Sequence, residues 1–339
     1  MKSIIQLFIN EKISVKTEEE WNEFNRNACN ANVFQTPELY SFWLLQNNSK
    51  PFVFIIRNSI EEIVGICSGI ILSNGNNLVS YFTRRAVIYG GPLFLNEESK
   101  GLVLQDLIFA INEKISKKAI YVEFRNFIDL TDYKDLFEKS NYKYLPYQNY
   151  LITLDNEENV QNKFKSEKRR QIRRALKEGV TFSVENTKAN IHGVYNILQK
   201  IYKEKVKKPL PGLSFFEDLC ELESANVMAL HYEGNVIGGG FFLKDKKTAY
   251  DWYRGGLDSK YKYQFPSTVA AWAVMRYGLN LKLESFDFMG GGLKGSDYGV
   301  GKFKAQFGGE LVEYGRFVSV FNPMLYNLGK TGLKLLKKR

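Results

Sequence analysis

A glycine-rich stretch in the last sixth of the chain holds the residue types best suited to chemistry. Phe286–Gly292 indicates a short apolar strand that runs through Asp287 into three glycines. The segment Gly301–Gly309 then holds two lysines and two phenylalanines, namely Lys302, Lys304, Phe303 and Phe307. Glycine lets backbone approach a ligand closely, because it has no Cβ. The stretch indicates a site for an anionic or acyl group beside an apolar wall, and the alternative is a glycine-rich hairpin with solvated lysines.

Composition narrows the class of protein around this stretch. With 339 residues the chain is long enough for two domains, and 44% hydrophobic and 25% charged residues are typical of a globular protein. No apolar run approaches the ~18 residues of a membrane span. Three widely spaced cysteines predict a reduced, cytoplasmic protein without a metal site, and two histidines disfavour histidine chemistry. The net charge of +10 implies anionic partners, which could be phosphates, nucleic acid or an acidic membrane face.

The elements that must position the glycine-rich stretch follow one order twice. Each half reads as hairpin, strand, Gly-Gly pair, helix and strand. In the first half these are 52–72, 79–89, 90–91, 102–115 and 120–124, and in the second half 227–243, 249–254, 255–256, 266–277 and 285–289. Pro266 begins the last helix and Gly278 is its expected stop. The pattern favours a duplicated α/β domain, and the alternative is a chance likeness between two ordinary α/β segments.

Basic segments lie outside these repeats. A helix is expected from the capping-box-like Asp155 and Glu158 to a stop at Gly179, and it is crowded with lysine and arginine. It is either a solvated helix face or a contact surface for phosphate or RNA. A second lysine cluster occupies 200–208. The amphipathic, basic end of the chain, 325–339, either packs on the body or contacts anionic lipid.

Four motifs together resemble the FemABX family of aminoacyltransferases, within the wider group of tandem GNAT-like acyltransferases. These are Phe34-Gln35-Thr36, the basic run 166–175 with Gly179-Val180, Tyr253-Arg254-Gly255-Gly256 with the helix 266–277, and Asp287-Phe288 leading to Phe303-Lys304 and Phe307-Gly308-Gly309. The resemblance spans residues 30–325. It implies an α/β fold of two GNAT-like domains in tandem, each a mixed twisted sheet flanked by helices. The expected domains are 1–152, with 311–339 returning to it, and 153–310.

The resemblance also implies roles for single residues. Lys304 would lie at the acyl-transfer centre with Phe303 beside it, where its charge could stabilise the oxyanion that develops on the acyl group. Asp287 could accept the proton of the amine or orient Lys304, or it could simply bond the loop amides. Residues expected to bind substrate are Tyr253, Arg254, Tyr298 and Lys302.

The function implied is transfer of an aminoacyl group from charged tRNA to an amine of a peptidoglycan or related cell-envelope precursor. No cofactor is expected beyond aminoacyl-tRNA, or acyl-CoA under the alternative of an N-acyltransferase that modifies an amino sugar of a surface polysaccharide. The basic, glycine-alternating loop that binds pyrophosphate in CoA-dependent GNAT enzymes is missing, because Gln264–Thr268 stands in its place. The acceptor would be a nucleotide-sugar or lipid-linked glycan precursor. The protein is expected in the cytoplasm, with possible peripheral contact at the inner face of the membrane. A non-enzymatic RNA-binding protein is the third alternative.

Overall fold

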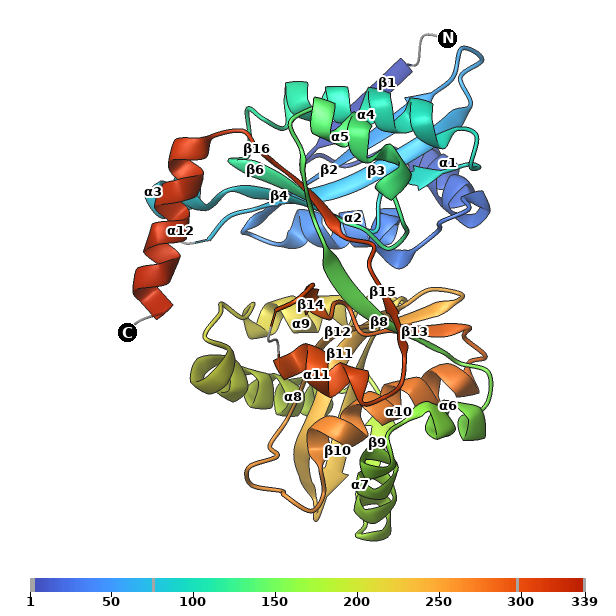
Figure 1. Ribbon diagram of the computed structural model, residues 1–339, viewed down its shortest axis with the longest axis vertical. Coiled ribbons are helices and arrows are strands. Elements are labelled where there is room, and N and C mark those ends of the chain that lie inside the picture. Colours follow the sequence, from blue (N-terminus) through green and yellow to red (C-terminus); the bar gives the residue numbers. More distant parts are fainter. Residues whose placement is uncertain (1–3, 75–76, 297–298, 338–339) are drawn as a thin grey trace. The chain divides into compact units, whose positions relative to one another are not determined.

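The chain forms two compact units, each built on its own sheet (Figure 1). The computed structural model describes residues 4–74, 77–296 and 299–337. One unit is Met1–Pro146 with Tyr314–Arg339, and the other is Tyr147–Glu313. Both sheets are mixed and have helices packed against them, so the tandem α/β fold expected from the sequence is confirmed. The expected boundary after residue 152 falls within β8 (Tyr147–Thr153), a strand that lies whole in the second unit.

In the first unit the described strands follow the order β1-β2-β3-β4-β6-β16-β7, and β5 pairs with β3. The strands are β1 (Ile4–Ile9), β2 (Ser49–Arg57), β3 (Ile63–Leu72), β4 (Arg85–Tyr89), β5 (Leu93–Phe94), β6 (Tyr121–Arg125), β7 (Lys143–Leu145) and β16 (Arg316–Val320). The helices are α1 (Val15–Asn27), η1 (Val33–Gln35), α2 (Pro37–Leu45), α3 (Asn77–Thr83), α4 (Lys100–Lys114), η2 (Thr131–Tyr133), α5 (Lys134–Lys139) and α12 (Pro323–Lys337). β16 thus brings the end of the chain back into this sheet, between β6 and β7.

The prediction that a strand begins at residue 79 is wrong, because the helix α3 occupies the first part of the expected range 79–89. α3 ends at Thr83, and β4 begins only at Arg85, where it first pairs with Leu72 of β3. The apolar residues before that point are exposed, Val79 at 50% and Tyr81 at 51%. Val79 and Tyr81 are not buried by a neighbouring strand, so their high β-propensity does not decide the structure of this segment.

In the second unit the described strands follow the order β14-β8-β13-β12-β11-β10-β9, and β15 pairs with β8. Besides β8 the strands are β9 (Thr181–Val184), β10 (Ala225–Tyr232), β11 (Asn235–Lys244), β12 (Thr248–Gly256), β13 (Ser285–Asp287), β14 (Gly292–Leu293) and β15 (Glu310–Val312). The helices are α6 (Glu157–Lys163), α7 (Ser166–Lys177), α8 (Lys188–Ile201), η3 (Tyr202–Val206), α9 (Leu213–Leu219), α10 (Pro266–Asn280) and α11 (Gly299–Ala305). The β10–β11 hairpin matches the expectation for 227–243.

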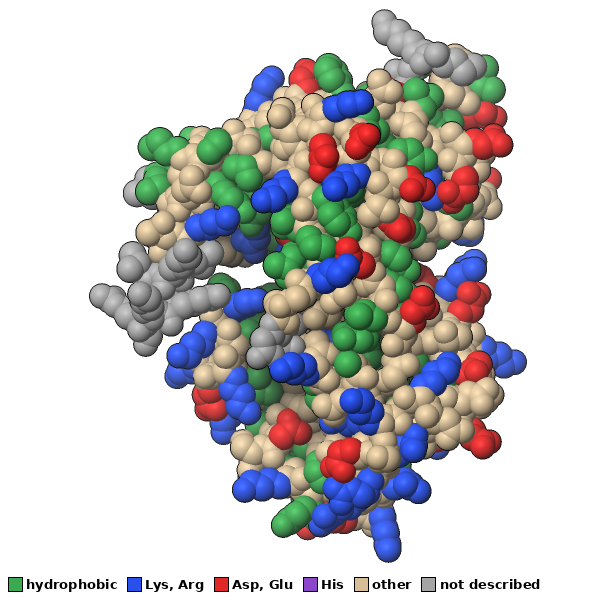
Figure 2. Space-filling view, viewed as in Figure 1, with side chains coloured by type: hydrophobic (Ala, Val, Ile, Leu, Met, Phe, Trp, Pro, Cys, Tyr) green, Lys and Arg blue, Asp and Glu red, His purple; other side chains and the backbone are tan. Residues whose placement is uncertain are grey.

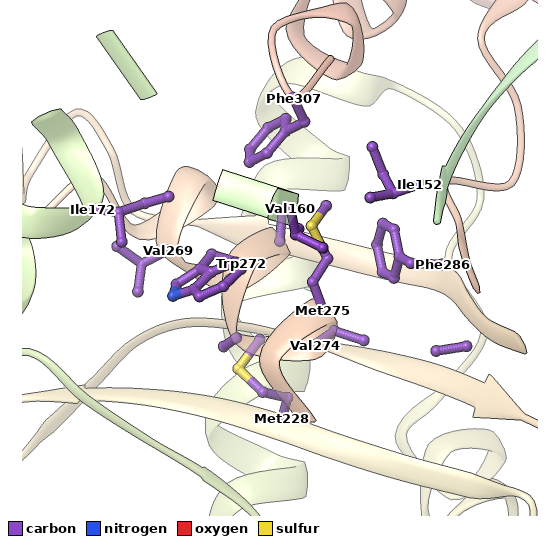
Figure 3. Packing of buried hydrophobic residues seen from close by; sticks show 14 of the residues in the cluster. Ile152, Val160, Ile172, Met228, Val269, Trp272, Val274, Met275, Phe286 and Phe307 are labelled. Atoms are coloured by element: carbon purple, nitrogen blue, oxygen red, sulfur yellow. The ribbon is translucent and has the colours of Figure 1, made fainter. Parts of the chain in front are cut away.

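Helix α10 is the centre of the second unit's core. Trp272 is 1% exposed, and Figure 3 shows it with Ile172 and Val269 nearby and Phe307 above. α10 runs on past Gly278, which is therefore not the expected stop. A Cβ at Gly278 would lie 2.7 Å from Leu154, so this glycine allows close packing inside the helix. Apolar as α10 is, no helix within the described parts of the chain has both the length and the apolar character to cross a bilayer.

The basic helix expected from 155 to 179 is two helices, α6 and α7. Phe164 leaves the helical conformation between them, with φ −69° and ψ 144°. Its ring lies 5.7 Å from that of Trp272 and 5.1 Å from that of Phe307, so burial of one aromatic side chain accounts for the break. The cap of α6 is Asn156, whose side chain accepts from the Asn159 amide, rather than Asp155. α7 ends at Lys177, just before Gly179, as expected.

Candidate active site

Two parallel strands of the second sheet separate at the point where the glycine-rich stretch begins. β12 pairs with β13 only from Thr248 to Tyr250, opposite Ser285 to Asp287. Beyond this point β12 continues to Gly256, while the chain after β13 turns away through Met289 and Gly290, both at positive φ. Glycine adopts the φ of +116° at position 290 without strain. Side chains from β12, α7 and α11 meet where the two strands separate.

Lys304 of α11 is buried at this separation. Its side chain donates to the carbonyl oxygen of Phe288 and, at 2.7 Å, to that of Gly290. An ammonium carries three N–H groups, and no third acceptor lies among the described residues. Burial, and to a lesser extent the charge of Arg254, lowers the pKa of Lys304, against the opposite effect of Asp251 and Asp287, and the net pKa is about 8. Lys304 therefore holds the glycine loop, and one of its N–H groups has no acceptor among the described residues.

Asp287 ends β13 and organises the same loop. Its Oδ1 accepts from Asn149 at 2.6 Å and from the Met289 amide at 2.5 Å. Asn149 in turn accepts from the Gly290 amide at 2.6 Å. Burial raises the pKa of Asp287, although these hydrogen bonds and Lys304 act to lower it. Of the alternatives left open by the sequence, the bonded geometry matches a carboxylate that binds loop amides and lies near Lys304.

A buried ion pair from β12 lies next to Lys304. The Arg254 Nε donates to both carboxylate oxygens of Asp251, at 2.9 and 3.1 Å, and the two side chains are only 9% and 4% exposed. A second nitrogen of Arg254 donates to the Ser267 carbonyl oxygen at 2.9 Å. A buried pair held by further hydrogen bonds fixes its members in one geometry. Arg254 is therefore a fixed charge inside the unit.

The ring of Phe303 lies close to two cations. The Lys168 Nζ is 4.5 Å from the ring centroid and the Arg254 Cζ is 5.2 Å from it. Lys168 comes from the buried face of α7, where its Nζ donates to Thr268 at 3.0 Å and to Gln171 at 3.1 Å. Burial lowers the pKa of Lys168, and Arg254 lowers it as well. Cation–π attraction to both cations holds the ring of Phe303, which directly precedes Lys304 in α11.

The residues predicted to form the site divide into three groups. Lys304, Phe303, Asp287 and Arg254 are brought together. Tyr253 points to the other face of the sheet, where its ring is 5.2 Å from that of Phe216 of α9. Lys302 is exposed on α11, and Tyr298 lies outside the described residues.

Three site residues were missed by sequence reasoning, namely Lys168, Asp251 and Asn149. A signal existed for Lys168, because it lies four and seven residues before Ile172 and Ala175, on the apolar stripe of α7. A lysine in such a stripe is expected to have a buried partner. Asp251 and Asn149 gave no local signal.

The first turn of α10 is closed by a carboxylate. Asp258 accepts from the Ser267 amide at 3.1 Å and also from the Ser267 hydroxyl. A helix N-terminus attracts anions through its unpaired amides and its dipole. Here Asp258 supplies the negative charge from within the chain, so a phosphate at this helix end would meet a carboxylate.

In the first unit the first of the four motifs lies at the antiparallel pair β3 and β4, and not at the parallel pair β4 and β6 that corresponds to β12 and β13. The Gln35 side chain accepts from the Ser68 amide at 2.7 Å and donates to the Ser68 and Tyr89 carbonyl oxygens, both at 2.8 Å. It thereby joins β3 to β4 where their pairing has ended at Ile70 and Val87. The motif is a structural bridge, and Gln35 is 0% exposed.

Comparison with known proteins agrees with this fold. The profile of the acetyltransferase (GNAT) domain family matches residues 162–298. Aminoacyltransferase FemA from Staphylococcus epidermidis is 26% identical over 228 residues, which cover 62% of this chain and 48% of that protein. FemA from Staphylococcus aureus (strain MW2) is 27% identical over 201 residues, covering 58% and 42%. The chain thus spans about half the length of the curated relatives it matches.

Solved structures extend the likeness to nearly the whole chain. The crystal structure of FemX aligns with a TM-score of 0.69 at 16% identity, covering 97% of this chain and 99% of that one. A tandem GNAT protein from the clavulanic acid biosynthesis pathway aligns with a TM-score of 0.58 at 9% identity, covering 95% and 99%. At sequence identities of 16% and 9%, these structural alignments show a shared fold only.

Proposed function

The chain belongs to the FemABX-like proteins with two GNAT-fold domains, and on this premise we propose that it is an N-acyltransferase of that type. It transfers an aminoacyl group from aminoacyl-tRNA to an amine of a peptidoglycan or related cell-envelope precursor. The observation that carries the proposal is the buried Lys304 ammonium at the separated ends of β12 and β13, with one N–H unused by the described chain.

The proposed reaction needs one bond formed and one broken. The acceptor amine attacks the carbonyl carbon of the aminoacyl ester, and negative charge develops on the carbonyl oxygen. The third N–H of Lys304 donates to this oxygen in a site of low dielectric, where such a bond stabilises the transition state most. The C–O bond to the ribose then breaks, and the ribose oxygen takes up the proton that the amine releases. Asp287 is a positioning residue, because it holds the loop whose carbonyls bind Lys304.

Helix α7 supports tRNA as the donor. Its inner face reaches Phe303 through Lys168, and its outer face carries the exposed basic residues Arg170, Arg173, Arg174 and Lys177. Figure 2 shows Lys and Arg side chains gathered at the end of the molecule where Figure 1 places α7. Tyr263 lies against this face, with the Arg174 Cζ 4.2 Å from its ring, and it is 59% exposed. Cations with an exposed aromatic ring suit phosphates and bases of RNA.

Acyl-CoA is the less supported donor. A CoA pyrophosphate needs amides or cations at its binding position, and Asp258 places a carboxylate at the first turn of α10. The amino-sugar alternative therefore ranks second. The acceptor in our proposal is a nucleotide-sugar or lipid-linked glycan precursor, and the reaction takes place in the cytoplasm, with the membrane's inner face as the location of a lipid-linked acceptor.

The test supplies both donors separately. Purified protein is incubated with radiolabelled aminoacyl-tRNA or radiolabelled acetyl-CoA, together with UDP-MurNAc-pentapeptide or UDP-glucosamine, and label in each acceptor is measured. We expect consumption of aminoacyl-tRNA alone, and a loss of about 10²–10³-fold in kcat for Lys304→Met, the usual cost of one oxyanion donor.

Lys100→Met is the matched control, because Lys100 is the buried lysine of the first unit, 9% exposed and paired with Glu97 at 2.6 Å. It should keep its activity. Turnover of acetyl-CoA by the unaltered protein contradicts the donor, and an active, folded Lys304→Met protein contradicts the site.

A further inference from the structure

Two helices of the first unit form an exposed apolar surface that the transfer reaction does not use. α12 packs against α3, and Tyr326 of α12 lies with its ring 5.1 Å from that of Tyr121. Outside this contact five large apolar side chains remain exposed: Val79 at 50%, Tyr81 at 51%, Phe82 at 43%, Met324 at 72% and Leu328 at 56%. We name these five residues the α3–α12 face. Figure 2 shows hydrophobic side chains, coloured green, gathered where Figure 1 places α3 and the beginning of α12.

Exposed apolar groups so close together are unusual on a globular protein and indicate a binding surface. Met324 and Leu328 are four residues apart and therefore share one side of α12. Tyr81 and Phe82 follow each other at the end of α3, with ring centroids 5.4 Å apart. An aromatic residue with a polar tip beside aliphatic side chains suits a boundary between water and hydrocarbon.

The charge around the face has one sign. Arg84 follows α3 and lies over the ring of Tyr81 at 4.2 Å, and Lys330 lies over the ring of Tyr326 at 4.4 Å. Neither the segment 73–96 nor the segment 314–339 contains an aspartate or glutamate. Within these two segments the charged side chains beside the apolar face are cations, an arrangement complementary to an anionic surface with an apolar interior.

We propose that the α3–α12 face binds a bilayer of anionic phospholipid, with the apolar side chains at the level of the headgroups and the cations on the phosphates. A second copy of the chain is a poorer occupant. In a twofold pair the same face meets itself, and the charges brought together would be cations such as Arg84 and Lys330. Such binding is independent of which acyl donor the protein uses.

The experiment measures co-sedimentation with vesicles, using the whole chain. Vesicles of phosphatidylcholine alone are compared with vesicles that also contain phosphatidylglycerol, at low and high salt. The variant is Met324→Glu with Leu328→Glu. Its matched control is Leu102→Glu with Phe109→Glu on α4 of the same unit, where the side chains are 45% and 70% exposed. Both pairs add the same charge at exposed apolar positions, and circular dichroism checks that both proteins are folded.

We expect the unaltered protein to bind the anionic vesicles and to release them as salt rises, because salt screens the cations. The α12 pair should lower the partition coefficient by about tenfold or more, and the α4 pair should leave it unchanged. An equal loss in both pairs, or no binding by the unaltered protein, overturns the proposal. So does a pair of α12 substitutions that abolishes self-association while vesicle binding is unchanged, because the face would then join two copies.

Discussion

At the scale of single residues, burial against two backbone carbonyls distinguishes Lys304 from the exposed lysines of the chain. Its Nζ is held by two backbone carbonyls and its pKa is lowered to about 8. Lys302, two residues earlier on the same helix, is exposed. A lysine whose charged form is only just stable near neutral pH responds to small changes in pH, which an exposed lysine does not.

The pH dependence of transfer should report this lysine. The reaction as proposed needs the ammonium, and the folded pKa is below the ordinary value, so the protonated fraction falls as pH rises through about 8. With a saturating donor, kcat should decline on that side of the profile. Lys304→Arg keeps the positive charge at any accessible pH, so the decline in kcat should move to higher pH. The maximum kcat should be lower, because the planar guanidinium differs in shape from the ammonium.

The measurement is kcat against pH for both proteins, with spontaneous hydrolysis of the aminoacyl ester subtracted. If kcat of the Lys304→Arg protein declines over the same pH range as kcat of the unaltered protein, the group that titrates is not Lys304.

At the scale of elements, α11 depends on a close contact that only glycine permits. Gly308 has φ +67°, and a Cβ there would lie 1.8 Å from the carbonyl oxygen of Lys163 at the end of α6. The Lys165 amide donates to the Gln306 carbonyl oxygen at 2.9 Å in the same junction. The junction between α6 and α7 thus fixes the C-terminal end of α11, and with it Lys304.

Gly308→Ala should therefore lower the free energy of unfolding by about 1–3 kcal/mol, since it combines left-handed backbone strain with a steric clash. Gly212→Ala is the control, because Gly212 has φ −68° and nothing within 4 Å of its Cβ position. It should change stability by less than about 1 kcal/mol. Urea denaturation of both proteins provides the comparison, and an equal effect at the two positions would contradict the role of the junction.

Elements and short-range groupings could be predicted from the sequence, whereas pairings across the chain could not. Thr36 caps α2 and Pro37 begins it, as the local pattern indicates. Asp287 and Lys304 meet because one glycine-rich stretch carries both. Asn149 and Asp287 are 138 residues apart, and Lys168 and Thr268 are 100 apart. Periodicity tells which face of an element is buried, but it does not tell which buried face lies opposite.

At the scale of the whole molecule, the net charge of +10 is spread over separate surfaces that should act differently. The outer face of α7 lies in the unit that holds Lys304, on the helix that contacts Phe303. The cluster at 203–208 belongs to the same unit, but it lies around η3 and beyond. Because α7 also carries Lys168, which contacts Phe303, we expect the charge of the α7 face, rather than that of the other cluster, to bind RNA.

We expect Arg173→Gln with Lys177→Gln to weaken binding of an uncharged tRNA and to reduce the slope of log affinity against log salt by about two, one for each lost phosphate contact. Lys205→Gln with Lys207→Gln removes the same charge from the other cluster and should leave the slope unchanged. Fluorescence anisotropy over a salt series measures both. If the two variants give identical slopes of log affinity against log salt, tRNA binding depends on the total charge of the protein and not on the α7 face.

The two halves share an architecture, yet their parallel strand pairs differ. In the first half β4 pairs with β6 over its whole length, from Arg85 to Tyr89, whereas in the second half β12 pairs with β13 only from Thr248 to Tyr250. A hybrid made of two copies of the first half would therefore lack the separated strand ends at which the second half carries the chemistry that we propose. Separating the strands in the first half would require breaking the ladder between β4 and β6, and with it part of the pairing that holds its own sheet together.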